Sequence, residues 1–176
     1  MRTRTNLTNT GMPFQRMVET SALAYPAGLI RLRKVDPPTR VVGSGADRRI
    51  IFLPNPFLDF VGVWIECAGR AVFIECKSTR EPKLQFDSSS GVTTAQLDAL
   101  RHWGTAGAVS FVLWQWIDKV KLVPWNVLAL GRDMARTSRE YKYLEWELAA
   151  LGPQIGRGSK WVIVDFLAEM RRLWKP

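Results

Sequence analysis

Two apolar runs separated by a short, glycine-containing segment constrain this chain more than any other feature. Residues 57–65 (FLDFVGVWI) and 71–77 (AVFIECK) are each long enough for a strand, and Ala68, Gly69 and Arg70 lie at their junction. A short connection that contains glycine favours adjacent antiparallel strands. The sequence therefore predicts a β-hairpin at the centre of the fold.

Both runs carry charged side chains that a buried strand seldom contains. Asp59 lies between Leu58 and Phe60, and Glu75 and Lys77 occupy alternate positions of the second run. Because side chains alternate across a strand, Glu75 and Lys77 share a face. Desolvating such groups costs free energy unless a partner or a function compensates for it. These three charged residues are therefore the main candidates for chemistry.

Whether Asp59 shares the face of Glu75 depends on the length of the turn. A two-residue turn would pair position 60 with position 77 and direct Asp59 away from Glu75 and Lys77. A three-residue loop at residues 68–70 would pair 61 with 77 and 63 with 75, which returns Asp59 to the face of Glu75. We therefore predict the three-residue loop, or a bulge near Asp59.

Two carboxylates and a lysine on one face suit the hydrolysis of a phosphodiester. Asp59 and Glu75 offer the hard oxygen ligands that Mg²⁺ or Mn²⁺ prefers, and so few protein ligands leave positions for water and a phosphate oxygen. Lys77 could orient that water or stabilise the charge of the transition state. A bare Glu-x-Lys pattern is common by chance, so its weight comes from the buried context and from the upstream Asp59.

The overall composition indicates one globular domain with an anionic partner. The chain has 176 residues, of which 47% are hydrophobic and 23% are charged, and its net charge is +9. This length suits a single core. A polyanion such as nucleic acid is the first partner to consider and an anionic membrane surface the second, although a solvated basic surface would give the same charge.

Several function classes are excluded by what the sequence lacks. Its single histidine, His102, argues against a histidine-based triad, and Cys67 and Cys76 are too few for a four-ligand zinc site or a disulfide framework. The N-terminus has no apolar signal core, and no apolar run is long enough to cross a membrane. We expect a cytoplasmic protein (in the host cytoplasm if viral) with no membrane partner and no organic cofactor.

The pattern of helices and strands predicts an α/β fold in a single domain, with a mixed sheet flanked by helices. A basic arm at residues 1–8 would precede the domain at 9–176. The remaining expected elements are a helix at about 10–24, a strand at 28–34, a helix from Thr93 or Thr94 to Trp103, strands at 108–117 and 119–123, a short helix from 124–126, and helices at about 138–151 and 159–174, the last capped by Ser159.

Basic residues are concentrated where nucleic acid could be held. The strand at 28–34 alternates apolar and basic residues, which gives it one basic face. Residues 36–56 are rich in proline and glycine and read as an excursion from the core, which we expect to be a projecting basic loop or ribbon. The candidate phosphate contacts are Arg31, Arg33, Arg40, Arg48, Arg49 and Lys83.

The succession of these features resembles the RecU-type Holliday junction resolvases. No single motif is specific, but their order matches that family over about residues 9–128. The matching features are Asn9-Thr10-Gly11 before a helix, the Pro37-Pro38 turn, the excursion, Leu58-Asp59-Phe60-Val61-Gly62, Phe73-Ile74-Glu75-Cys76-Lys77-Ser78-Thr79, Gln96 on a helix, and the apolar strand at 109–113.

The resemblance implies a homodimeric nuclease of the PD-(D/E)XK superfamily that makes paired nicks in four-way DNA junctions with Mg²⁺ or Mn²⁺. The family's catalytic residues would fall on Asp59, Glu75 and Lys77, and its helix glutamine on Gln96. Its stalk, which enters the junction centre, would correspond to residues 36–54, with Arg40, Arg48 or Arg49 as contacts.

The chain departs from the family in its first helix, in the 16-residue interval from Asp59 to Glu75, and in its C-terminal part. Relatives carry a glutamate on the first helix that can complete the metal site, whereas the aligned residue here is Gln15. Glu19, one turn later on the same helix face, could substitute, or it could be an ordinary solvated residue. Residues 131–176 have no match, and we expect them to form a helical extension of the core or of the dimer interface.

Two other functions remain open at this point. A non-catalytic junction-binding protein could keep the fold, and it would bind no divalent ion at Asp59 and Glu75. A restriction or repair nuclease of the same superfamily would cut a different DNA substrate, so it would not prefer a four-way junction over a matching linear duplex.

Overall fold

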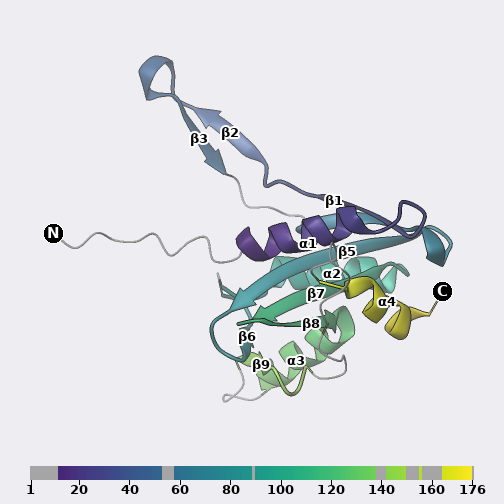
Figure 1. Cartoon of the computed structure of the whole chain (residues 1–176). Helices are drawn as coiled ribbons and strands as arrows, with labels where there is room; N and C mark the ends of the chain where they lie inside the picture. The colour runs from purple at the N-terminus through teal and green to yellow at the C-terminus, as the bar shows by residue number, and fades with distance from the viewer. Residues whose placement is uncertain are drawn as a thin grey trace.

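A mixed five-stranded sheet forms the centre of the molecule (Figure 1). The computed structural model describes residues 12–52, 58–88, 90–137, 142–149, 155 and 164–175, so the predicted arm at 1–8 and Ser159 lie outside the described residues. The order is β1-β4-β5-β7-β8, in which β7 is parallel to β5 and all other neighbours are antiparallel. The strands are β1 (Ile30–Lys34), β4 (Phe60–Trp64), β5 (Arg70–Thr79), β7 (Val109–Trp116) and β8 (Lys119–Pro124).

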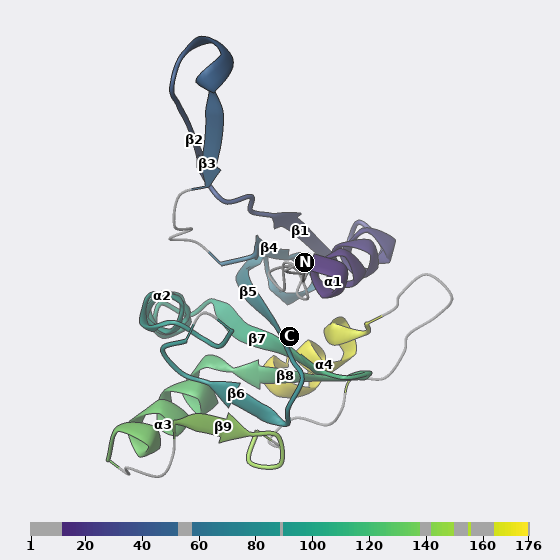
Figure 2. The same cartoon turned by 90° about the vertical axis from the view of Figure 1, so that its left-hand side faces the viewer.

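Helices lie on both faces of this sheet. Helices α1 (Met12–Ala24) and α4 (Phe166–Trp174) cover one face, and α2 (Thr94–Thr105) and α3 (Trp125–Thr137) cover the other, as Figure 2 shows with the sheet between them. A small sheet of β6 (Lys83–Gln85) and β9 (Tyr143–Glu145) lies beside α3. The predicted α/β class is thereby confirmed. Among the described helices, none is both long and apolar enough to span a membrane.

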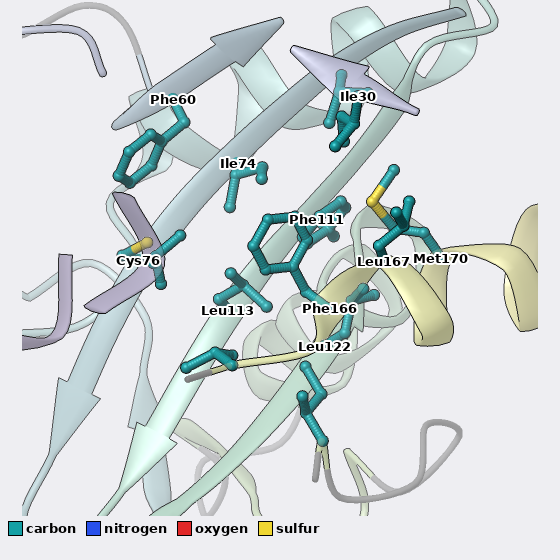
Figure 3. Close-up of a cluster of buried hydrophobic side chains, with 14 of the residues drawn as sticks. Ile30, Phe60, Ile74, Cys76, Phe111, Leu113, Leu122, Phe166, Leu167 and Met170 are labelled. Atoms are coloured by element: carbon teal, nitrogen blue, oxygen red, sulfur yellow. The ribbon is translucent and has the colours of Figure 1, made fainter. Parts of the chain in front are cut away.

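The alternation of β5 divides its side chains between two apolar cores. Val72, Ile74 and Cys76 point toward α1 and α4, whereas Phe73 points toward α2. The first core also contains residues of β7, β8 and α4. Some of its members are labelled in Figure 3: Ile30, Phe60, Ile74, Cys76, Phe111, Leu113, Leu122, Phe166, Leu167 and Met170. Because apolar residues fill alternate positions, Glu75 and Lys77 fall on the α2 face.

The connection between β4 and β5 has the predicted parity but not the predicted length. Trp64 pairs with Arg70, so five residues, 65–69, connect the strands, and position 61 pairs with 73 rather than with 77. The first three form a short 3₁₀ helix, Ile65–Cys67. The amides of Ile65 and Glu66 donate to the carbonyl of Leu29, which holds this longer connection against the start of β1.

Gly62 allows β1 and β4 to approach closely. A Cβ at this position would lie 2.8 Å from Leu32 Cα and still closer to the carbonyl oxygen of Arg31, so the backbone itself would have to move. We expect Gly62→Ala to lower the free energy of unfolding by about 1 to 3 kcal/mol, the usual cost of overpacking.

Urea denaturation measures the effect of Gly62→Ala, and Gly28→Ala is the matched control. A Cβ at Gly28 would meet no atom within 4 Å, so this variant should unfold as the wild type does. Equal stability of the two variants would contradict the close approach.

The excursion is a two-stranded ribbon that projects from the sheet. Strands β2 (Thr39–Val42) and β3 (Arg49–Phe52) pair antiparallel around a short 3₁₀ helix, Gly45–Asp47. Figures 1 and 2 both show the ribbon extending away from the rest of the molecule. The described part of the predicted excursion is therefore a projecting ribbon, and its remainder, residues 53–56, lies outside the described residues.

The predictions for the C-terminal part were partly wrong. Residues 143–145 were expected in a helix, but they form β9, which pairs with β6. The extension at 131–176 is therefore not wholly helical. The last helix begins at Phe166, where Asp165 caps it by accepting a hydrogen bond from the amide of Ala168, and residues 164 and 165, which were expected within the helix, precede it. The helix expected near 124–126 is α3, which extends to Thr137.

Candidate active site

Asp59 and Glu75 lie close together at the end of the β4–β5 pairing. The last paired residues are Phe60 and Ile74, and Asp59 and Glu75 are the next on each chain. The carboxylate of Asp59 accepts a hydrogen bond from the backbone amide of Cys76 at 2.8 Å through Oδ2. This contact holds the Asp59 side chain beside the backbone of β5, next to Glu75.

The second carboxylate oxygen of Asp59 is bound from helix α1. Gln15 Nε2 donates to Asp59 Oδ1 at 2.8 Å. Gln15 is on the same helix as Phe14 and Val18, which are buried in the core under the sheet, so packing of α1 fixes its position. Three elements, α1, β5 and the segment before β4, therefore define where the Asp59 carboxylate lies.

Glu75 is almost fully buried, yet only one of its carboxylate oxygens is hydrogen-bonded. Oε1 accepts from Gln96 Nε2 at 2.6 Å and contacts Lys77 Nζ at 3.0 Å. Oε2 has no hydrogen-bond partner among the described residues, although it is buried. A buried carboxylate oxygen without a partner is costly, and such atoms in native proteins often point to an unmodelled ion or a functional role.

The orientation of Gln96 follows from its place at the start of α2. Its Oε1 accepts from the backbone amide of Thr93, while the Thr93 hydroxyl accepts from the amide of Gln96, which is a capping box. Because the amide oxygen is engaged in this cap, the NH₂ group is the end that faces Glu75. The start of the helix thus orients a donor toward the carboxylate.

Burial raises the proton affinity of both carboxylates. For Glu75, burial and then the nearby Asp59 charge raise the pKa to about 7, against the lowering effect of Lys77. Burial also raises the pKa of Asp59, and the Cys76 amide, Lys77 and Gln15 act in the opposite direction. Two acids that share one desolvated site are each harder to ionise, and a cation placed between them would reverse this.

The donor set suits a small, hard divalent cation. Asp59 and Glu75 supply carboxylate oxygens, and Glu75 Oε2 is free of other partners in the described part of the chain. That part contains no cluster of three or more His, Cys, Asp or Glu residues arranged to hold a metal. Mg²⁺ is commonly bound through one or two carboxylates while waters and substrate phosphates complete its shell. The residues present therefore fit Mg²⁺ or Mn²⁺.

Gln15 and Glu19, the two residues of α1 considered for the metal site, lie in different surroundings. Gln15 contacts Asp59, as described above. Glu19 is half-buried and lines a cavity of about 400 Å³ between α1 and β1, together with Arg33, Lys34 and Asp36. Glu19 therefore does not join the two carboxylates through any hydrogen bond or ion pair between described residues.

The six predicted phosphate contacts lie in three places. Arg31 and Arg33 are exposed on β1, and register places them on the sheet face that carries Glu75. Lys83 lines a cavity of about 310 Å³ beyond the end of β5 and lies over the ring of Tyr143. The remaining three, Arg40, Arg48 and Arg49, are exposed on the ribbon.

One buried residue near the site, Arg132, was not predicted from the sequence. Arg132 on α3 is buried, donates to Thr94 Oγ1 at 2.8 Å and lies 3.5 Å from Asp98 Oδ1. It thereby connects α3 to the first turn of α2, which carries Gln96. In the sequence Arg132 looks like any charged residue of an amphipathic helix, because its partners are more than thirty positions away.

Comparisons with known proteins find similarity in structure but not in sequence. No protein-family model matches the chain, and no curated protein matches it. Among solved structures, it is similar to Hjc, a Holliday junction resolvase from the archaeal hyperthermophile Archaeoglobus fulgidus, at 16% identity and a TM-score of 0.49. The match covers 82% of this chain and 95% of that one. Because this similarity is low, the residues of the site are the basis for the function proposed below.

Proposed function

We propose that the chain is a divalent-metal-dependent endodeoxyribonuclease that nicks four-way DNA junctions. The observation that carries the proposal is the cluster of Asp59, Glu75 and Lys77, in which Glu75 Oε2 is buried with no partner among the described residues. Burying such a group is costly, and in native proteins it often points to a bound ion or a functional role. The net charge of +9 agrees with a DNA substrate.

Each residue of the site has a distinct role in the proposed reaction. Asp59 and Glu75 would hold Mg²⁺ or Mn²⁺, which when bound supplies a Lewis acid for the phosphate and lowers the pKa of water. Lys77, held 3.0 Å from Glu75, places a positive charge where negative charge grows on the phosphate. Gln15 and Gln96 orient the two carboxylates by their hydrogen bonds.

The choice of a branched substrate is supported by the ribbon. The β2–β3 ribbon extends well beyond the sheet (Figure 2), and its three arginines are exposed. They could therefore contact DNA at a branch point that the sheet itself would not reach. The family resemblance noted from the sequence has a stalk at the same place. We further propose a homodimer in which each protomer cleaves one strand of the junction.

Cleavage of a four-way junction should be compared with cleavage of a linear duplex that has the sequence of one arm. In Mg²⁺ or Mn²⁺ the junction should be nicked much faster than the duplex, and EDTA should stop the reaction. Equal rates on both substrates would favour a nuclease with another specificity. Absence of cleavage, together with no divalent-ion binding by calorimetry, would favour a non-catalytic junction-binding protein.

Replacing the three ribbon arginines, Arg40, Arg48 and Arg49, with alanine should weaken junction binding without changing the site. Each phosphate contact that is lost should reduce the slope of log K against log salt by about 0.9, because fewer counterions are released. Fluorescence anisotropy over a series of salt concentrations measures this slope. Alanine at three exposed cations elsewhere, Arg136, Lys142 and Lys175, is the charge-matched control. An identical slope for both triple variants would show that the ribbon makes no special contact.

A further inference from the structure

Within the described part of the chain, helix α2 covers only part of the sheet face that carries Glu75. Helix α2 packs on β5 and β7, while the same face of β1 and β4 has exposed side chains, with Val63 40% exposed. The register places two rows across this face: Arg31, Val63 and Ala71 in one, and Arg33, Val61 and Phe73 in the other. We call these six residues the β1–β4 outer face.

An aromatic pair borders the β1–β4 outer face on its α2 side. Phe73 stacks on Trp103 with ring centroids 4.5 Å apart and an angle of 10° between the rings, and the His102 ring stands at 78° to the indole. Trp103 nevertheless remains 39% exposed. The indole of Trp103 is thus packed against Phe73 and is still accessible to solvent.

This aromatic pair lies close to the carboxylates. Phe73 is two residues before Glu75 on the same face of β5, which corresponds to about 7 Å. Trp103 is seven residues after Gln96 on α2, which corresponds to about 10 Å along the helix. Since Gln96 contacts Glu75 and Trp103 contacts Phe73, α2 and β5 together place the indole within one or two nucleotides of the reactive cluster.

The positive charge of the β1–β4 outer face favours a nucleic-acid strand as its partner. The two rows of the β1–β4 outer face contain Arg31 and Arg33 and no acidic residue. Neither arginine forms an ion pair with another residue in the described part of the chain. A second copy of this chain would bring these like charges together, whereas a nucleic-acid strand brings phosphates to the arginines and a base to the indole.

We propose that the β1–β4 outer face, with Trp103, binds single-stranded DNA, so that one unpaired base stacks on Trp103 while Arg31 and Arg33 contact the backbone. The placement of this base beside the scissile phosphate rests on the proposed function. Such a surface would favour DNA with an unpaired or readily opened nucleotide at the branch, because a base that stays paired cannot stack on Trp103.

Binding of a labelled oligothymidylate, measured by anisotropy in a Glu75→Gln background without divalent ions, tests the proposal apart from catalysis. Trp103→Ala should weaken binding by about 5-fold or more, the usual effect of losing one base–aromatic stack, and Trp103→Phe should retain most of the affinity. Trp174→Ala, a half-buried tryptophan on α4 that packs against Phe111 on the opposite face, is the matched control and should bind normally.

A double variant at the two arginines tests the same surface independently, in case Trp103→Ala does not fold. Arg31→Gln together with Arg33→Gln changes exposed side chains and should weaken oligothymidylate binding and flatten its salt dependence. Unchanged affinity in both the tryptophan and the arginine variants would overturn the proposal. So would a loss of self-association in sedimentation that accompanies any loss of binding, because the surface would then be a protein interface.

The two proposals can fail separately. If wild-type protein nicks junctions but Trp103→Ala binds oligothymidylate normally, the stacking surface is wrong and the nuclease stands. If wild-type protein cuts no DNA but Trp103→Ala loses binding, the surface stands and the nuclease is wrong.

Discussion

Glu75→Gln should slow junction nicking by about 10³-fold or more while junction binding stays close to that of the wild type. The substitution keeps the shape of the side chain and its contact with Gln96, but it removes a charge that would hold the metal. Binding rests on the basic residues of β1 and the ribbon, which are unchanged. Single-turnover cleavage of a four-way junction in Mg²⁺ measures the rate, and a gel-shift assay in Ca²⁺ or EDTA measures binding.

Glu169→Gln is the matched control for Glu75→Gln. Glu169 is also a buried glutamate, 7% exposed, and it pairs with Arg172 through Oε1 at 2.6 Å, but it is on α4 at the other face of the sheet. Its variant should cut at the wild-type rate. Wild-type cutting by Glu75→Gln would refute the proposed mechanism, and equal losses in both variants would indicate general destabilisation instead.

Without divalent ions, the protein should become less stable as the pH rises from about 5 to about 7. The pKa of Glu75 is raised from its ordinary 4.5 to about 7 in the folded state. Between these values the folded chain retains a proton that the unfolded chain has lost, so raising the pH favours unfolding. A shift of this size corresponds to a loss on the order of 3 kcal/mol, and the raised pKa of Asp59 acts in the same direction.

Urea denaturation in EDTA at several pH values measures this dependence. The stability difference between wild type and Glu75→Gln isolates the contribution of Glu75, and it should change across this window and stay constant above it. Mg²⁺ should restore stability at high pH, because it binds the ionised carboxylates of the folded state. A difference that does not vary with pH would mean that Glu75 ionises normally.

The sequence was sufficient to predict the hairpin and the parity of its connection, but not the length of that connection. Strict alternation in a strand makes the parity of the loop decisive, and a loop of three or of five residues meets that requirement equally. The choice between them depends on the carbonyl of Leu29, which binds the amides of Ile65 and Glu66. The longer connection ends the β4–β5 pairing at Phe60 and Ile74, the neighbours of Asp59 and Glu75, whereas the three-residue loop would have paired position 63 with 75.

The errors in the C-terminal part have a common physical cause. Residues 143–145 form a strand only because β6, sixty positions earlier, offers an edge to pair with. The start of α4 is likewise fixed by the Asp165 side chain, which contacts the hydroxyl of Tyr25 as well as the helix. Such distant partners override local helix patterns and leave little trace in them.

The site was more predictable than its surroundings. Glu75 and Lys77 share a face because of their spacing alone, and Gln15 and Gln96 were identified through the family resemblance. Arg132 and the Phe73–Trp103 pair were missed, because each joins elements that are far apart in the sequence. The roles of all these residues in catalysis stay predictions until the variants above are measured.

Gln96 makes two hydrogen bonds, one in the cap of α2 and one to Glu75, so the position of Glu75 depends on whether the first turn of α2 is formed. The same amide group closes the cap at Thr93 and binds Glu75, so fraying at the first turn of α2 withdraws the donor from the carboxylate. Helix ends are the parts of a protein that open most readily. Disorder in the first turn of α2 would therefore leave Glu75 Oε1 without the Gln96 donor, while its contact with Lys77 would remain.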